Sequence, residues 1–277
     1  MTVSSNRIFD ERALRGEEAY VYGLKARAQR HHCLGHGTFS VELDHLGDLR
    51  KRYSRERVPI TALPFYVKAV ALAMSQNPEA NAVLFKKPFS LRIARFERVD
   101  VNLPITRMVE GRRITFVGTI RDAASRSLAE IQREISFHQK GPPEESFAIQ
   151  RMLRFSRMPF WKARLAHWRM TWSPEFYIRN VGSCALTYLE GGGYERIFPI
   201  APTSVAFGIG TSGREAVVCG DEIVIRRRLR CTLMVDNFVV SGLTAARLVR
   251  DFKELLESGA FVHRELAEDP RPAHAIP

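Results

Sequence analysis

One stretch near the C-terminus carries the most information about the fold: Leu229-Arg-Cys-Thr-Leu-Met-Val-Asp-Asn-Phe-Val-Val-Ser-Gly242. Its first half alternates like the end of a strand that begins at Ile223. Gly242 then leads into an amphipathic helix over Leu243–Leu256, which Gly259 is placed to stop. A strand that enters a tight turn before a helix is a common place to mount a reactive side chain. We therefore treat this turn as the candidate functional site.

Working outward, the rest of the chain predicts strands and helices without regular βαβ alternation, which favours an α+β fold. Strands are expected over residues 38–43, 92–98, 100–106, 113–120, 183–189, 205–209, 217–219 and 223–235. Helices are expected over residues 17–29, 46–53, 62–76 and 127–139, besides the closing one. We expect N-caps at Asp44 and Thr61 and a capping box at Ser127-Leu-Ala-Glu130.

Composition excludes several classes of protein. The 277 residues hold 42 basic and 30 acidic side chains, a net charge of +12, so the chain suits an anionic partner without specifying which one. The longest apolar run, Leu63–Met74, contains a lysine and is too short to span a bilayer. Residues 1–10 lack the apolar stretch of a secretory signal. The four cysteines lie far apart, which argues against a metal site and a disulfide framework and predicts a cytoplasmic protein.

Six short segments occur in an order that resembles one family, the dihydrolipoamide acyltransferases of the 2-oxoacid dehydrogenase complexes, specifically their catalytic domain. That family shares a superfamily with chloramphenicol acetyltransferase. The matching segments cover roughly Gly37 to Ser258: Ser40–Asp44 with Leu49-Arg50, Val67–Ala71 through Pro78–Asn81, Ile120–Ala123 with Ser127–Ile131, Gly182–Thr187, Phe198–Pro202, and Gly220–Ile223. The chain resembles a stand-alone form of this domain, because no Asp-Lys-Ala lipoyl hairpin and no Ala/Pro-rich linker occur in it.

The resemblance implies a chloramphenicol acetyltransferase-like mixed sheet with flanking helices, assembled as a homotrimer with its active site between subunits. On this basis we expect an N-terminal extension over residues 1–30 and an acyltransferase-like domain over 31–260. A basic, aromatic insert occupies residues 151–180, and a mobile tail is expected over 261–277.

The family signature Asp-His-x-x-x-Asp-Gly is altered in this chain. Asp236 and Gly242 remain, but Asn237 stands at the histidine position and Ser241 at the second aspartate position. In the family the histidine removes a proton from the attacking thiol. Asparagine takes up no proton at neutral pH, and loss of a general base typically costs about 10²- to 10⁴-fold in rate.

The remaining site residues follow from the same resemblance. Thr187 aligns with the family hydroxyl that stabilises the tetrahedral oxyanion. Ser183, with Asp236 and Gly242, is expected to bind substrate. Cys184 is expected to face away from Thr187 and to act as a small buried residue.

A replacement base could come from His31, His32 or His36, which cluster before the first strand. A solvated, basic chain entry is the favoured interpretation of this cluster, because nothing in the sequence fixes its geometry. Ser241 as a nucleophile is less favoured still, since no neighbouring base is visible.

Two functions therefore stand. The first is a degenerate acyltransferase, a pseudoenzyme kept for oligomeric assembly or for binding an acyl group or CoA. The second is an active CoA-dependent acyltransferase with a non-standard base. No covalently bound cofactor and no lipoyl group are expected on this chain, and CoA or acyl-CoA is the candidate ligand. Candidate partners are further copies of the chain, in a trimer or a larger shell, and a carrier protein or a dehydrogenase-complex subunit.

The insert over 151–180 holds all three tryptophans and only one acidic residue, Glu175. We favour a cap over the acyl channel with its tryptophans packed inward, and an amphipathic surface for peripheral membrane or fatty acyl contact is the second interpretation. Nucleic acid is disfavoured because no recognised binding motif occurs. Arg226, Arg228 and Arg230 share one strand face, either a CoA-phosphate surface or, as we favour, a solvated face.

Overall fold

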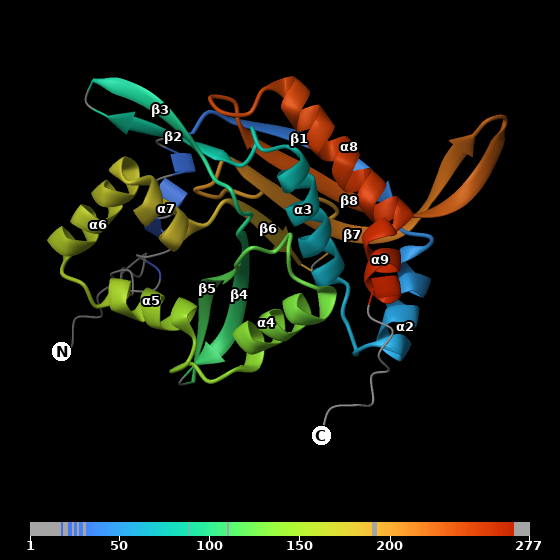
Figure 1. Ribbon diagram of the computed structural model, residues 1–277, viewed down its shortest axis with the longest axis horizontal. Coiled ribbons are helices and arrows are strands. Elements are labelled where there is room, and N and C mark those ends of the chain that lie inside the picture. The colour runs from blue at the N-terminus through green and yellow to red at the C-terminus, as the bar shows by residue number, and fades with distance from the viewer. Residues whose placement is uncertain are drawn as a thin grey trace, which may run out of the picture.

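A computed structural model describes residues 32–87, 89–109, 111–189 and 193–268, together with residues 18, 22, 23, 25, 26, 28 and 29. A mixed sheet of six strands in the order β1-β8-β7-β6-β4-β5 forms its centre (Figure 1). These strands are β1 (Leu34–Glu42), β4 (Val101–Val109), β5 (Arg112–Ile120), β6 (Cys184–Tyr188), β7 (Val205–Cys219) and β8 (Glu222–Asp236). β6 runs parallel to both of its neighbours, and the other pairs are antiparallel.

Helices cover one side of this sheet: α2 (Leu46–Glu56), α3 (Leu63–Gln76), α4 (Leu128–Lys140), α8 (Gly242–Ser258) and α9 (Ala260–Glu268). The inner parts of β7 and β8 are buried without alternation, so both faces of the sheet are covered there. α3 is buried along nearly its whole length, because α8 and α4 pack on it from outside. The predicted α+β fold with a mixed sheet and flanking helices is confirmed.

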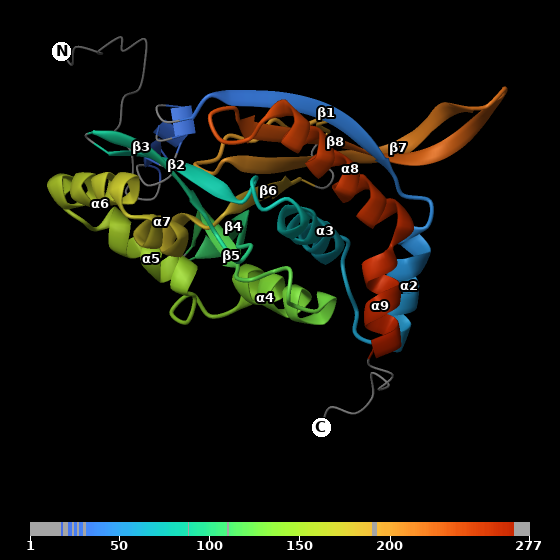
Figure 2. The same cartoon turned by 45° about the horizontal axis from the view of Figure 1, so that its top comes forward.

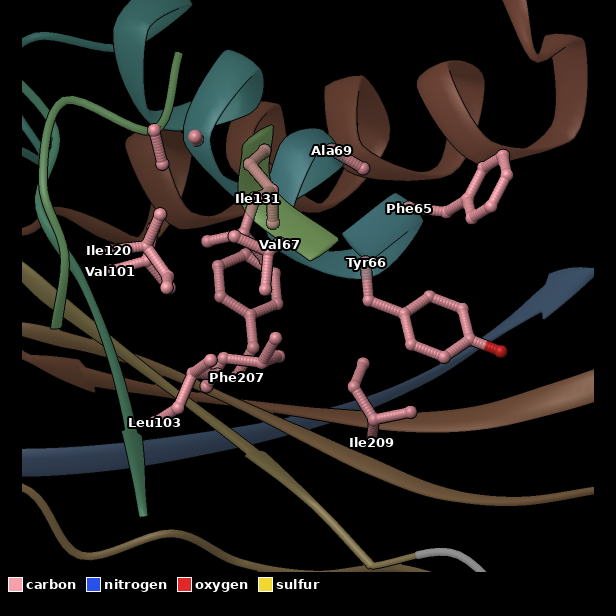
Figure 3. Close-up of a cluster of buried hydrophobic side chains, with 14 of the residues drawn as sticks. Phe65, Tyr66, Val67, Ala69, Val101, Leu103, Ile120, Ile131, Phe207 and Ile209 are labelled. Atoms are coloured by element: carbon pink, nitrogen blue, oxygen red, sulfur yellow. The ribbon is translucent and has the colours of Figure 1, made fainter. Parts of the chain in front are cut away.

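The main core lies between α3 and the sheet (Figure 3). Phe65 and Val67 of α3 and Phe207 of β7 are fully buried there. A buried phenylalanine of this kind contributes roughly 2–3 kcal/mol through its apolar area, so this contact holds the helix layer on the sheet.

The insert forms three helices at one end of the molecule: α5 (Phe147–Ser156), α6 (Phe160–Trp172) and α7 (Pro174–Val181). α6 and α7 enclose a second small core against a two-stranded ribbon, β2 (Ala82–Lys87) and β3 (Ser90–Arg95), which lies beside them in Figure 2. α5 packs on β5, and its buried residues belong to the main core. Arg121 fixes α7 to the sheet, since its guanidinium donates to the buried Asp100 carboxylate at 2.5 Å and to the Ile178 carbonyl at 3.0 Å.

The two longest strands extend past the body as a hairpin. Residues Val205–Gly210 of β7 are all buried, whereas accessibility alternates beyond them. Figure 2 shows this ribbon projecting from the end opposite the insert.

Several local expectations are confirmed. Ser127 accepts from the Glu130 amide while Glu130 accepts from the Ser127 amide, which is the predicted capping box. Gly259 ends α8 in the left-handed conformation with φ of 61°. The described residues of the predicted N-terminal helix, Ala28 among them, are helical.

Other local expectations are wrong. Asp44 does not cap α2, because its carboxylate accepts from the Arg226 guanidinium and the Arg227 amide. Thr61 does not cap α3, since its hydroxyl donates to Gln132. β2 was not expected, and the two segments predicted at 205–209 and 217–219 form one strand, β7.

The C-terminal region also differs from expectation. α9 occupies the first part of the predicted mobile tail, where Phe261, Val262 and Leu266 are buried against the core. His31 and the tail from residue 269 lie outside the described residues. Within the part of the chain that the structure describes, no helix combines the length and apolarity needed to cross a membrane.

Candidate active site

The turn between β8 and α8 is organised by the Asp236 carboxylate. This side chain is fully buried and accepts from the Cys33 amide at 2.9 Å and the Phe238 amide at 3.1 Å. The Asp236 carbonyl accepts from the amides of Val239 and Val240 at 2.9 and 2.8 Å. One residue thus fixes both the turn and the chain segment that enters β1.

A third donor reaches this carboxylate from His32, whose Nδ1 lies 2.6 Å from Asp236 Oδ2. The His32 side chain is only 2% exposed, and its Nε2 atom is buried with no hydrogen-bond partner. Burial raises the pKa of the Asp236 carboxyl, but the hydrogen bonds from His32, Cys33 and Phe238 outweigh burial and hold the pKa below its usual range. The favoured interpretation of the histidine cluster as a solvated entry is wrong for His32.

His36 behaves differently. It is exposed on β1, and its ring meets Phe198 edge-on at 5.7 Å between centroids. Of the two described members of the cluster, only His32 contacts a motif residue through its side chain in any hydrogen bond or ion pair given by the structure.

Asn237 lies at a groove between β1 and α8. Its amide donates to the Cys33 carbonyl at 2.8 Å, and its side chain lies over Gly35, where an added Cβ would come within 2.6 Å of Nδ2. The groove has a volume of about 430 Å³. Its lining is Gly35, His36, Gly37, Thr38, Phe39, Leu233, Val235, Asn237, Ala245, Ala246 and Val249. This mostly apolar lining suits an apolar, chain-like ligand, with Asn237 as a polar contact.

Ser241 is the N-cap of α8. Its hydroxyl accepts from the Thr244 amide at 3.2 Å and lies 3.0 Å from the Thr244 hydroxyl. Gly242 is the first helical residue, and a Cβ there would meet no neighbour. These two motif positions therefore shape the helix start in this chain.

Thr187 lies on β6, two strands away from the turn. The register pairs Thr187 with Gly208 and Gly208 with Thr232, and Asp236 follows four residues later along β8. At about 4.8 Å between strands and 3.4 Å per residue, Thr187 and Asp236 are separated by more than roughly 15 Å in the sheet. One chain alone does not bring the predicted oxyanion donor to the motif turn.

The Thr187 strand has two further features. Ser183 is buried, with its hydroxyl accepting from the Asp100 amide at 2.7 Å and donating to the Asp100 carbonyl at 3.1 Å, so it joins the residues that directly precede β6 and β4. Its predicted role in substrate binding stays a prediction. Cys184 is fully buried on the opposite face from Thr187, as expected, and burial raises the pKa of its thiol.

The arginine row on β8 is paired with carboxylates. Arg226 contacts Asp44 at 3.1 Å, and Arg228 and Arg230 contact Glu215 at 3.7 and 2.8 Å. This pairing agrees with a solvated face rather than a phosphate surface. No cluster of three His, Cys, Asp or Glu side chains suited to a metal ion occurs among the described residues.

The sheet, the helix layer and the motif turn together form an α+β domain whose fold and sequence can be compared with known proteins. Residues 27–152 match the family model described as 2-oxoacid dehydrogenases acyltransferase (catalytic domain). The predicted resemblance to that catalytic domain is confirmed.

Curated relatives agree with this family. The chain is 24% identical over 217 residues to the dihydrolipoyllysine-residue acetyltransferase component of the pyruvate dehydrogenase complex of Rickettsia prowazekii, covering 78% of this chain and 45% of the relative. It is 26% identical over 236 residues to the component of the same name from Corynebacterium glutamicum, covering 80% and 30%. The chain thus spans less than half the length of these relatives.

Solved structures show the same fold. The dihydrolipoamide acetyltransferase of Azotobacter vinelandii matches with a TM-score of 0.68 at 17% identity, covering 95% of this chain and 97% of that one. A probable dihydrolipoamide acetyltransferase from Listeria monocytogenes matches with a TM-score of 0.65 at 16% identity, covering 93% and 95%.

Proposed function

We propose that this chain is an acyltransferase-type domain that binds an acyl group or a CoA-type thioester in an oligomer, and that its motif site has lost the general base. The proposal rests on what the side chains at the two altered motif positions, Asn237 and Ser241, do in the structure. Asn237, which stands at the histidine position of the family motif, lies at the groove, and Ser241 caps a helix. Neither side chain takes up a proton at neutral pH.

The groove beside Asn237 supports a binding function. Its apolar walls come from β1, β8 and α8, and its volume of about 430 Å³ suits the thioester end of a ligand better than a whole nucleotide cofactor. We propose that the acyl or pantetheine part enters this groove and that the Asn237 amide hydrogen-bonds to it.

The separation of Thr187 from the turn supports oligomerisation. If Thr187 and Asn237 act on one ligand, a second copy of the chain must supply one of them. We propose a homotrimer, the assembly that the resemblance implies. One matching structure, with a TM-score of 0.66, is the cubic core of a pyruvate dehydrogenase multienzyme complex, so larger shells and complex subunits are further candidate partners.

Calorimetry and turnover on one purified sample test this proposal. CoA and acetyl-CoA are titrated, and thiol release is followed with a panel of acceptors, for wild type and for the Asn237→His, Ser241→Asp variant. Binding without turnover by wild type, and turnover by the variant, is the expected result. If wild type turns over faster than the variant, the proposal that the site has lost its general base is wrong.

A second candidate function is favoured by one observation, the His32–Asp236 pair. A carboxylate that holds the Nδ1 side of an imidazole and leaves Nε2 unpartnered is the arrangement of a general base and its orienting acid. In this alternative the chain is an active acyltransferase with His32 as its base. Because His32 Nε2 is buried, the chain around it must first move to expose this atom to substrate. Turnover by wild type that is abolished by His32→Gln would select it.

A further inference from the structure

The outer face of α6 carries an apolar stripe whose printed ring contacts are made only with residues of the same helix, Trp168 with Trp172 and Trp161 with Lys162. Trp161, Leu165 and Trp168 are 63%, 55% and 54% exposed, although such side chains are usually covered. They are spaced by four and three residues, so they form one row along the helix. Met170, which is buried in the small core of the insert, marks the opposite side of the same helix.

Basic side chains border this row. Lys162 and Arg169 are exposed beside it, with the Lys162 ammonium 5.2 Å from the Trp161 ring centre and Arg169 over the Phe176 ring at 4.9 Å. No Asp or Glu occurs from residue 151 to residue 174, and the next acid, Glu175, opens α7. The face therefore combines apolar area with basic side chains, in a segment that carries an excess of positive charge.

We propose that this face of α6 docks on an anionic phospholipid surface. Tryptophan is favoured at the depth of lipid headgroups, leucine reaches the acyl boundary, and flanking lysine and arginine attract anionic headgroups. The helix would lie in the plane of the interface with the stripe inserted and the sheet held above it. This inference is independent of the chemistry at the motif turn.

Two other occupants fit the same observations less well. A second copy meeting this face in a two-fold contact would place like charges opposite one another with no acids to pair them. A nucleic acid would gain stacking from the tryptophans, but Leu165 in the centre of the row offers a base nothing to stack on.

Intrinsic fluorescence tests the proposal directly, because the three tryptophans of the chain, Trp161, Trp168 and Trp172, all lie in α6. Phosphatidylglycerol vesicles should shift the emission to the blue, and phosphatidylcholine vesicles should not. Brominated lipid should quench the emission. Raising NaCl from 0.1 to 0.5 M should weaken binding, because it screens the basic border.

Vesicle co-sedimentation of variants shows whether binding depends on the stripe or on other parts of the surface. Trp161→Ser with Trp168→Ser should abolish binding, and Lys162→Glu with Arg169→Glu should weaken it by roughly tenfold or more. The control is Leu91→Ser with Ile93→Ser, which removes exposed apolar side chains from the face of the β2–β3 ribbon that points away from α6. It should bind vesicles like wild type.

Four results would each overturn the proposal. They are absent binding to anionic vesicles, binding that the stripe variants leave intact, a loss of oligomeric state in the stripe variants by light scattering, and vesicle-independent binding of the stripe to nucleic acid. Circular dichroism of each variant confirms that the fold is retained before these results are compared.

Discussion

The imidazole of His32 contacts the carboxylate of Asp236 at 2.6 Å, and the two buried side chains join segments that are 204 residues apart in the chain. The contact lies where β1 begins and β8 ends, directly before Asn237. The motif turn is therefore anchored by the residues that enter the sheet. Asp236, the residue before Asn237, therefore holds the motif turn and the start of β1 together.

Replacement of Asp236 should change how stability depends on pH. The pKa of its carboxyl is lowered from 3.8 in the folded state, so the stabilisation is fully present above the unfolded pKa. It is lost as pH falls through the lower folded pKa. Asp236→Asn should reduce stability at pH 7 by about 1–3 kcal/mol and flatten the acid limb of the curve.

Urea denaturation at a series of pH values measures this effect. Asp48→Asn is the control, because the Asp48 side chain is 83% exposed and pairs only with the exposed Lys51 in the described ion pairs. An unchanged acid limb in Asp236→Asn would contradict the assigned role of the carboxylate.

Two strand glycines offer a test of the groove. A Cβ at Gly35 would come within 2.6 Å of Asn237 Nδ2, whereas a Cβ at Gly213, on the outer part of β7 and outside the groove lining, would meet nothing within 4 Å. Gly35→Ala should displace Asn237 and weaken CoA or acetyl-CoA binding by roughly tenfold, the loss of one good hydrogen bond. Gly213→Ala should leave affinity nearly unchanged in the same calorimetric titration, and equal losses in both variants would argue against a contact through Asn237.

Ser241 allows capping to be separated from chemistry. Ser241→Ala should cost about 1 kcal/mol of stability, because the Thr244 amide loses its acceptor. Ser241→Asp keeps a good cap and should unfold within about 0.5 kcal/mol of wild type. If Ser241→Ala proves as stable as wild type in thermal unfolding, the hydroxyl does not act as a cap.

Gly259 and Gly220 share a φ of 61° but differ in their surroundings. A Cβ at Gly259 would lie 2.2 Å from Leu49 Cδ1, and one at Gly220 would face open space. Gly220→Ala should cost about 1 kcal/mol from backbone strain alone, and Gly259→Ala roughly 1–3 kcal/mol more from the clash. Chemical denaturation compares the two, and equal costs would show that Leu49 moves aside freely.

Local signals in the sequence predicted the elements whose partners are close in the chain. The capping box at Ser127 and the helix stop at Gly259 are of this kind, because both are satisfied within a few residues. Asp44 and Thr61 also carry capping side chains, but their partners, Arg226, Arg227 and Gln132, come from distant segments. A capping rule that considers only neighbouring residues cannot predict that these distant groups take the side chain away from the helix start.

The candidate site was predictable only in part. The altered motif at Asn237 and Ser241 was found from the resemblance, since both positions are defined by spacing. The pairing of His32 with Asp236 was not found, because the first strand was expected to start at residue 38 rather than at Leu34. With the observed start, the antiparallel register places Leu34 opposite Asp236, and His32 comes within reach of the carboxylate.

The strands of the long hairpin, β7 and β8, are buried in the sheet at one end and form a two-stranded ribbon at the other. The first part of β7 is buried between layers, while its outer part, from about residue 211 to Cys219, pairs only with β8. Backbone amides of the inner part should therefore exchange hydrogen only when the whole domain unfolds, and those of the outer part by local opening. A single continuous strand would then show a steep gradient of protection along its length, with the break near the register shift between Ile209 and Ser212.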